Sequence, residues 1–217
     1  MPIQNFIDYK GIPLQQSPSY TEIFKNFLTK QQFTHILEIG TGSGGFTMFL
    51  RDTLPFTKIL TFDIEPKPDH DKLKAKSVDV RISQVFDEAI NNTDWDICYK
   101  QVDAETVNNS VTPKLIDQSV VSFLSEPGKK LILCDGGHKV GEFNCLAPYL
   151  KKGDFIMAHD YADTYDRFVT SIKGKFWDWC EIEEKYITKA SEENNLVFYN
   201  QIVFETCLLY TSDAADE

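Results

Sequence analysis

The segment Ile36–Gly45, which reads ILEIGTGSGG, constrains the fold of this chain more than any other stretch. Its apolar residues predict a buried strand, and its glycines predict a tight turn directly after that strand. Glycine accepts positive φ angles and lets backbone amides approach a ligand closely. Phe46, Phe49 and Leu50 then begin a helical pattern. A strand, a glycine turn and a helix in this order are typical of a nucleotide-binding βα unit.

The glycine spacing alone is compatible with two classes of cofactor. Gly40, Gly42 and Gly45 match the dinucleotide pattern G-x-G-x-x-G. Glu38 favours the other class, because a carboxylate there would repel a pyrophosphate but suits the cationic amino-acid end of S-adenosylmethionine (SAM). With Glu38, the pattern E-x-G-x-G-x-G resembles the first motif of class I SAM-dependent methyltransferases. The resemblance implies cofactor contacts from Glu38, Gly40, Thr41, Gly42 and Gly44.

A second strand is predicted over Lys58–Ile64, and Asp63 lies near its end. An acid about 20 residues after the glycine turn can bind the two ribose hydroxyls of a cofactor. Both SAM and NAD enzymes use such an acid, so Asp63 does not separate them, and its alternative role is a helix or turn cap. The third strand stays open between Val78–Phe86 and Ile97–Ala104.

Two further strands are predicted to end in polar residues. Lys130–Cys134 is followed by the D-G-G-H segment Asp135–His138, and Phe155–Ala158 is followed by His159-Asp160-Tyr161. The carboxyl ends of parallel strands share one edge of a sheet, so we expect these groups to be neighbours. Asp135 and Asp160 could then share a hard cation such as Mg²⁺. His138 lies in the turn, and the unperturbed pKa of a histidine suits a general base at neutral pH.

The stretch Leu131–Tyr161 resembles the small-molecule O-methyltransferases known as cephalosporin hydroxylases, and the related macrolide-sugar O-methyltransferases. The resemblance implies a catalytic histidine at His138 and metal-binding carboxylates at Asp135 and Asp160. Metal-using relatives carry a carboxylate or amide where this chain has His159, and imidazole suits Mn²⁺, Fe or Zn better than Mg²⁺. Strand alternation would also turn His159 away from Asp160.

Simpler roles remain open for the same residues. Asp135 could contact the cofactor or cap a helix, His138 could be a turn residue, and Asp160 could be a structural acid. Four aromatic residues could wall an acceptor pocket or simply pack: Tyr161, Tyr165, Trp177 and Trp179.

The order of elements predicts an α/β fold. Strands and helices alternate, and two β-rich runs, Cys180–Ile187 and Leu196–Phe204, flank the polar segment ASEENN as in a hairpin. We therefore expect a single Rossmann-like methyltransferase domain over residues 19–206. Its sheet should be seven-stranded and mostly parallel, with a C-terminal antiparallel hairpin and helices on both faces. Residues 1–18 should form a lid-like segment.

The end of the chain, Cys207–Glu217, resembles translated sequencing-adapter read-through of the kind found in metagenomic sequences. We expect this segment to be artefactual and to lie outside the fold. The alternative is a genuine acidic tail.

Composition excludes several classes of protein. The net charge of −11 disfavours a nucleic-acid partner. The absence of a long apolar run or leader-like N-terminus predicts a cytoplasmic protein without a membrane partner. The 5 cysteines are scattered without a C-x-x-C pair, which indicates reduced thiols and no zinc site. Homo-oligomerisation stays open.

These observations predict methyl transfer from SAM to a hydroxyl of a small molecule or sugar, with metal assistance as an option. One alternative is a NAD-binding sugar-nucleotide or oxidoreductase-type enzyme, but the chain has no suitable Tyr-x-x-x-Lys pair. A non-catalytic SAM-binding protein is another. A nucleic-acid methyltransferase would need the N/D-P-P-Y/F type of motif, which the sequence lacks.

Overall fold

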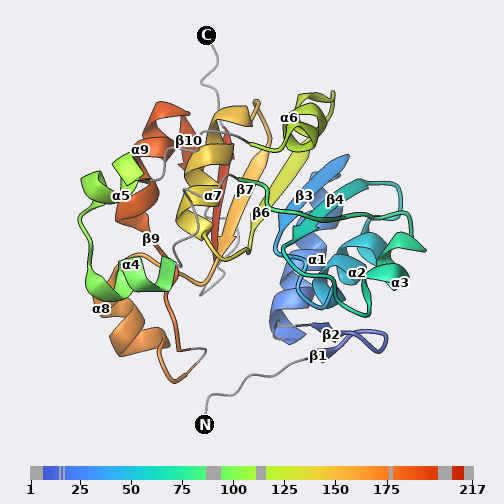
Figure 1. The fold of residues 1–217 in the computed structure, drawn as a ribbon, viewed down its shortest axis with the longest axis horizontal. Helices are drawn as coiled ribbons and strands as arrows, with labels where there is room; N and C mark the ends of the chain where they lie inside the picture. Colours follow the sequence, from blue (N-terminus) through green and yellow to red (C-terminus); the bar gives the residue numbers. More distant parts are fainter. Residues whose placement is uncertain are drawn as a thin grey trace.

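A computed structural model describes residues 7–14, 16, 18–86, 94–110, 116–175, 178–199 and 207–212. Within these ranges the centre of the molecule is a seven-stranded sheet of order β10-β11-β7-β6-β3-β4-β5 (Figure 1). Its strands are β3 (His35–Ile39), β4 (Lys58–Asp63), β5 (Asp79–Ile82), β6 (Lys130–Cys134), β7 (Phe155–His159), β10 (Leu196–Phe198) and β11 (Cys207–Ser212). The pairings from β7 to β5 are parallel, and β11 is antiparallel to both its neighbours. The predicted fold class is confirmed.

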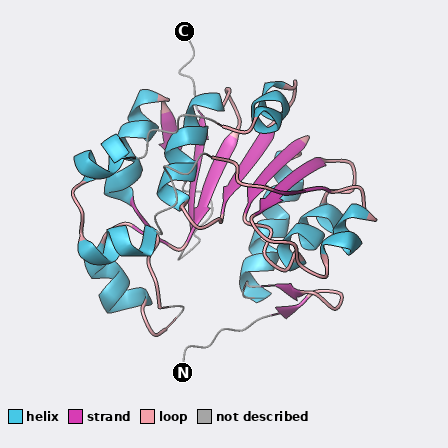
Figure 2. Ribbon diagram, in the orientation of Figure 1, coloured by secondary structure: helices cyan, strands magenta, loops and turns pink. Residues whose placement is uncertain are grey.

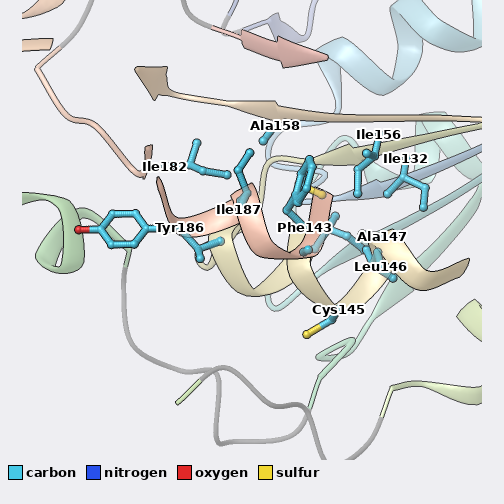
Figure 3. Close-up of a cluster of buried hydrophobic side chains, with 14 of the residues drawn as sticks. Ile132, Phe143, Cys145, Leu146, Ala147, Ile156, Ala158, Ile182, Tyr186 and Ile187 are labelled. Atoms are coloured by element: carbon cyan, nitrogen blue, oxygen red, sulfur yellow. The ribbon is translucent and has the colours of Figure 1, made fainter. Parts of the chain in front are cut away.

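Helices cover both faces of this sheet (Figure 2). One layer contains α1 (Pro18–Gln31), α2 (Gly45–Thr53) and α3 (His70–Lys74), and the other contains α6 (Gln118–Ser125), α7 (Lys139–Leu146) and α9 (Glu184–Glu193). Alternate residues of β6 serve the two layers: Leu131 and Leu133 pack with the first, Ile132 and Cys134 with the second. Figure 3 shows the second layer, where Phe143 of α7 lies among buried strand residues. Near-continuous apolar runs are typical of parallel strands that are buried on both faces.

The remaining described elements are short. They are β1 (Ile7–Asp8), β2 (Pro13–Leu14), α4 (Asp94–Lys100), α5 (Ala104–Ser110), the 3-10 helix η2 (Ala147–Tyr149), β8 (Tyr161–Ala162), α8 (Tyr165–Arg167), the π-helix η3 (Phe168–Ile172) and β9 (Ile182–Glu183). No helix of the described residues is long and apolar enough to cross a membrane.

The third strand is β5, within the first of the two predicted stretches, and Ile97 of the second lies in α4. β5 is one of the two edge strands of the described sheet, and most of its side chains are exposed. An edge strand needs little apolar surface, which explains why its sequence signal was weak. The buried Cys98 of α4 packs into the core from a helix instead.

The prediction of a strand over Cys180–Ile187 is wrong beyond the two-residue β9. Residues from Glu184 onward form α9, in which Tyr186, Ile187 and Ala190 recur at helical spacing and are buried. The polar segment ASEENN, which the sequence predicted as a hairpin turn, is largely the last turn of this helix, which ends at Glu193. The apolar residues pack beside α7, so a helical period governs this segment and not a strand period.

The C-terminal hairpin exists, but its second strand is β11. Leu196 pairs with Ser212 and Phe198 with Tyr210, while Leu209 pairs with Met157 of β7. The expectation that everything from Cys207 onward lies outside the fold is therefore wrong for Cys207–Ser212. This run supplies the strand that joins β10 to β7, and its central residues are buried. Its resemblance to adapter sequence remains a prediction, and residues 200–206 and 213–217 lie outside the described ranges.

The described part of the N-terminal segment packs against the first helical layer. Ile12 and Leu14 are fully buried with residues of α1 and α2. A Cβ on Gly45 would lie 2.3 Å from the carbonyl oxygen of Pro13. The glycine at the start of α2 therefore permits β2 to lie directly on the helix, whereas action as a lid remains a proposal.

Candidate functional site

The carboxyl ends of β3, β4 and β6 are tied together by backbone hydrogen bonds. The Gly40 N–H donates to the Phe62 carbonyl at 2.8 Å, and the Asp135 N–H donates to the Ile39 carbonyl at 2.9 Å. Gly40 has φ of 93°, and a Cβ there would lie 2.2 Å from the carbonyl oxygen of Asp135. Glycine is thus required where the turn after β3 passes the end of β6. The predicted glycine turn and the D-G-G-H segment do meet at one edge.

Asp63 holds the glycine turn in place. One of its carboxylate oxygens accepts the Gly42 N–H at 2.7 Å, and the other accepts the Glu65 N–H at 3.0 Å. His70 Nε2 also lies 2.9 Å from the Gly42 carbonyl oxygen. The turn-capping alternative therefore describes Asp63 in this structure. Ile64, which follows it, is 71% exposed and places an apolar surface beside the turn.

Glu38 lies beneath the turn and is almost fully buried. Its Oε2 accepts the hydroxyls of Thr47 and Thr61, both at 2.6 Å, and the Thr61 hydroxyl also lies 2.6 Å from that of Thr41. Burial raises the pKa of Glu38 to about 7, although the two threonine hydroxyls oppose this shift. The Thr61 hydroxyl therefore links the Glu38 carboxylate, whose hydrogen-bond donors are neutral hydroxyls, to Thr41 of the glycine turn.

The second set of predicted residues converges at the ends of β6 and β7. Asp135, His159 and Asp160 each offer one ligand atom, and these atoms lie within 4.8 Å of one another. Asp160 has φ of 57°, a left-handed conformation that costs a non-glycine residue about 1–3 kcal/mol and is common at functional sites. This conformation brings His159 Nδ1 within 2.9 Å of Asp160 Oδ1. The expectation that strand alternation separates these two side chains is wrong, because the backbone leaves strand geometry at Asp160.

Lys139 is a central member of this cluster that sequence reasoning missed. Its Nζ lies 3.3 Å from Asp160 Oδ2 and 3.4 Å from Asp135 Oδ1, and it also forms an ion pair with Glu181. The ammonium further donates to the Gly136 carbonyl at 3.1 Å. The Lys139 side chain is only 4% exposed. A signal existed for Lys139, because it lies four residues after Asp135 at a helix start. Glu181 has no such local signal, since only tertiary structure brings it here.

The ionisation of the cluster follows from its opposite charges. Burial works against the charge of Lys139, but Asp160, Asp135 and Glu181 outweigh it and hold the lysine pKa well above its usual value. Burial also works against the charge of Asp160, yet His159 and Lys139 keep the pKa of that carboxyl below its usual range. Asp135 is 36% exposed at its side chain, and burial of its carboxyl raises its pKa.

His138 acts in the structure as the N-cap of α7. Its Nδ1 accepts the Gly141 N–H at 3.0 Å, and burial lowers its pKa to about 4. A ring nitrogen that accepts from backbone is not available to an acceptor hydroxyl, and a group with so low a pKa is a weak base. The geometry therefore favours the turn-residue alternative for His138. Glu142, one turn further on, accepts the N–H groups of Gly136 and His138 at 3.2 Å each.

The surroundings of the cluster include residues from distant segments. Gln16, in the N-terminal segment, is buried and places its Oε1 3.3 Å from His159 Nε2. Tyr161 and Tyr165 are half-buried and Trp179 is exposed, while Trp177 lies outside the described residues. The aromatic residues therefore remain a proposal for an acceptor pocket, whereas Gln16 directly contacts the cluster.

The chain resembles solved structures in fold. It has a TM-score of 0.52 and 12% identity with CmcI-N160 in its apo form, over 96% of this chain and 77% of that one. An O-methyltransferase family protein from Burkholderia thailandensis gives 0.51 and 8%, over 91% and 56%. A SAM-dependent methyltransferase from Clostridium acetobutylicum gives 0.50 and 10%, over 96% and 93%. The chain thus spans little more than half the length of the Burkholderia protein. At these identities the likeness concerns the fold alone.

Sequence comparison is more specific. No curated protein sequence matches the chain. The model of one family, described as rhamnosyl O-methyltransferase/CmcI, matches residues 3–212, which include both the glycine turn and the cluster at the ends of β6 and β7. This match confirms the resemblance stated from Leu131–Tyr161. The chain therefore belongs to the rhamnosyl O-methyltransferase/CmcI family.

Proposed function

We propose that the protein transfers a methyl group from SAM to a hydroxyl of a small molecule or sugar. The observation that carries the proposal is the pair of polar sites on adjacent strand ends, one beneath the glycine turn and one around Asp135. Membership of the O-methyltransferase family supports the same reaction. Neighbouring sites are what a two-substrate transfer needs, because catalysis requires the methyl donor and its acceptor to be held in contact.

The β3–β4 side binds the cofactor in this proposal. Gly40, Thr41, Gly42 and Gly44 bring backbone close to the ligand, and Glu38 offers negative charge toward the cationic amino-acid end. Asp63 places a carboxylate beside the turn, and such an acid is suited to the ribose hydroxyls. The exposed side chain of Ile64 offers an apolar surface for the flat adenine ring.

The β6–β7 side receives the acceptor. Asp135 is the most exposed carboxylate of the cluster, and its raised pKa makes it a better proton acceptor than an ordinary aspartate. We assign it the proton that the acceptor hydroxyl loses as its oxygen bonds to the methyl carbon. The sulfur keeps the electrons of the broken bond. Lys139 and Asp160 hold Asp135 and His159 in place during this step.

The family resemblance also implies a divalent cation, which would polarise the hydroxyl when bound. The residues present do not fit such an ion in their observed arrangement. Lys139 Nζ already bridges Asp135 and Asp160, and His159 Nδ1 lies at hydrogen-bonding distance from Asp160. We therefore derive no step through a metal.

Cofactor binding tests the proposal most directly. Calorimetry should show S-adenosylhomocysteine binding in the micromolar range, about −8 kcal/mol, with NAD(H) binding much more weakly. Asp63→Ala should weaken binding by about 1.5–3 kcal/mol because a charged hydrogen-bonding group is lost. Asp79→Ala is the matched control, since Asp79 lies on the neighbouring strand β5 and pairs with Arg81. Tighter binding of NAD(H) than of S-adenosylhomocysteine would assign the chain to the oxidoreductase alternative.

A further inference from the structure

We propose that the Lys139 ammonium takes the place of the divalent cation in this site, and that removing it would create a metal site. The inference rests on the proposed methyl transfer, because it concerns the acceptor side of the same site. Its test measures metal binding alone. The proposal assigns to this chain a cationic group of its own where the family resemblance implies a divalent cation.

The first argument is position. A divalent cation shared by Asp135 and Asp160 would lie about 2.0–2.6 Å from an oxygen of each. Lys139 Nζ already lies between these carboxylates, 3.4 Å from Asp135 Oδ1 and 3.3 Å from Asp160 Oδ2. An ion in the same place would have to displace an ammonium whose side chain is 4% exposed. Like charges at such a distance repel strongly in a poorly hydrated interior.

The second argument concerns the remaining ligand. His159 Nδ1 lies 2.9 Å from Asp160 Oδ1, and its Nε2 lies 3.3 Å from Gln16 Oε1. Both ring nitrogens therefore face oxygen acceptors and are placed to donate hydrogen bonds. A metal ligand must instead present an unprotonated nitrogen. The arrangement uses His159 as a donor to Asp160 and not as a ligand.

The third argument is what anchors Lys139. Glu181, from the segment before β9, forms an ion pair with the ammonium, and the Gly136 carbonyl accepts from it at 3.1 Å. Neither group belongs to the three-residue set that could hold an ion. These contacts hold the ammonium in position independently of Asp135 and Asp160. The cluster is therefore built around its lysine.

Manganese binding tests the inference. Binding is measured from the electron paramagnetic resonance signal of free Mn²⁺. The wild-type protein should not bind Mn²⁺ saturably at millimolar concentration. Lys139→Met removes the charge while keeping similar side-chain volume, and it should bind Mn²⁺ at least about tenfold more tightly than wild type. Adding Asp135→Asn to that variant should abolish the gained binding, because it removes a ligand charge. Lys139→Arg keeps the cation and should behave as wild type.

Lys130→Met is the matched control. Lys130 is also a buried lysine, but it lies at the start of β6, at the opposite end of that strand from the cluster. Its ammonium donates to the Gly128 carbonyl. This variant should gain no Mn²⁺ binding. Micromolar Mn²⁺ binding by wild type that Asp135→Asn abolishes would overturn the inference, even if Lys139→Met failed to fold. A folded Lys139→Met without Mn²⁺ binding would also overturn it. Binding of S-adenosylhomocysteine to wild type, measured separately, shows whether the proposed function itself has failed.

Discussion

Glu38 and Asp160 are both buried carboxylates at the same edge of the sheet, yet their pKa values move in opposite directions. Burial raises the pKa of Glu38 to about 7, since the neutral hydroxyls of Thr47 and Thr61 lower it too little to offset burial. The pKa of Asp160 falls below its usual range, because His159 and Lys139 offer positive charge. Burial is common to both sites, so the charge of the partners decides the ionisation.

The contrast separates the two halves of the proposed active site. The β6–β7 half contains the Lys139 ammonium, which forms ion pairs with three carboxylates of the chain itself. The Glu38 half has hydroxyl partners, and a cationic ligand above the glycine turn would stabilise its ionised form. In the two proposals above, this difference favours a positively charged cofactor in the Glu38 half and disfavours an added metal ion in the other.

Truncation of the chain after residue 206 should cause the largest loss of stability, and it acts on the half of the site that contains β7. It removes β11, whose Leu209 and Tyr210 are buried and whose backbone pairs with β7 from Phe155 to His159. Loss of these two side chains alone should lower the free energy of unfolding by about 3–6 kcal/mol. Urea unfolding measures this quantity.

Truncation after Ser212 is the matched control, since it removes residues beyond the strand, and it should leave stability unchanged. If the shorter truncation product is as stable as the full chain, the segment is dispensable, as its resemblance to adapter sequence implies. If it is less stable but keeps the pH dependence of stability that Glu38 confers, the effect of the truncation is confined to the half of the site that contains β7.

Lys139→Met should have the next largest effect. It leaves Asp135, Asp160 and Glu181 without their shared cation, and breaking a buried ion pair costs about 3–5 kcal/mol. Lys130→Met, which removes a similarly buried lysine that donates to a carbonyl, should cost about 1 kcal/mol. Equal losses in the two variants, measured by urea unfolding at neutral pH, would show that the β6–β7 cluster is not held together by charge.

The smallest expected effect is the pH dependence that Glu38 confers. Its pKa is about 7 in the folded chain and near 4.5 when unfolded, so the folded state binds more protons between these values. Stability from this group is therefore present below about pH 4.5 and is lost as pH rises through 7, by up to about 3 kcal/mol. Glu38→Gln cannot ionise and should lack this component.

The measurement is the difference in unfolding free energy between wild type and Glu38→Gln from pH 5 to pH 8. Taking the difference cancels Glu142, whose pKa burial also raises to about 7. A difference that does not change with pH would mean that Glu38 ionises normally. Saturating S-adenosylhomocysteine, which carries the same amino-acid end, should reduce the difference if that end lies near Glu38.

Local sequence patterns predicted the parts of the site that depend on single strands. The turn at Gly40, the acids Asp63 and Asp135, and the H-D-Y segment all lie where parallel strands end, because a strand and its following turn are encoded together. Local patterns failed where one segment has two plausible periods. Tyr186 and Ile187 fit a short strand as well as a helix, and only packing beside α7 decides between them.

The sequence by itself determined the α/β class, the glycine turn and the family, since each depends on residues that are close together in the chain. Tertiary structure decided which groups act on one another. It placed Glu181 and Gln16 against Lys139 and His159, turned Asp160 back onto His159, and made His138 a helix cap. Electrostatic energy depends on distances through space and on burial, and neither can be read from the order of residues when the partners come from distant segments.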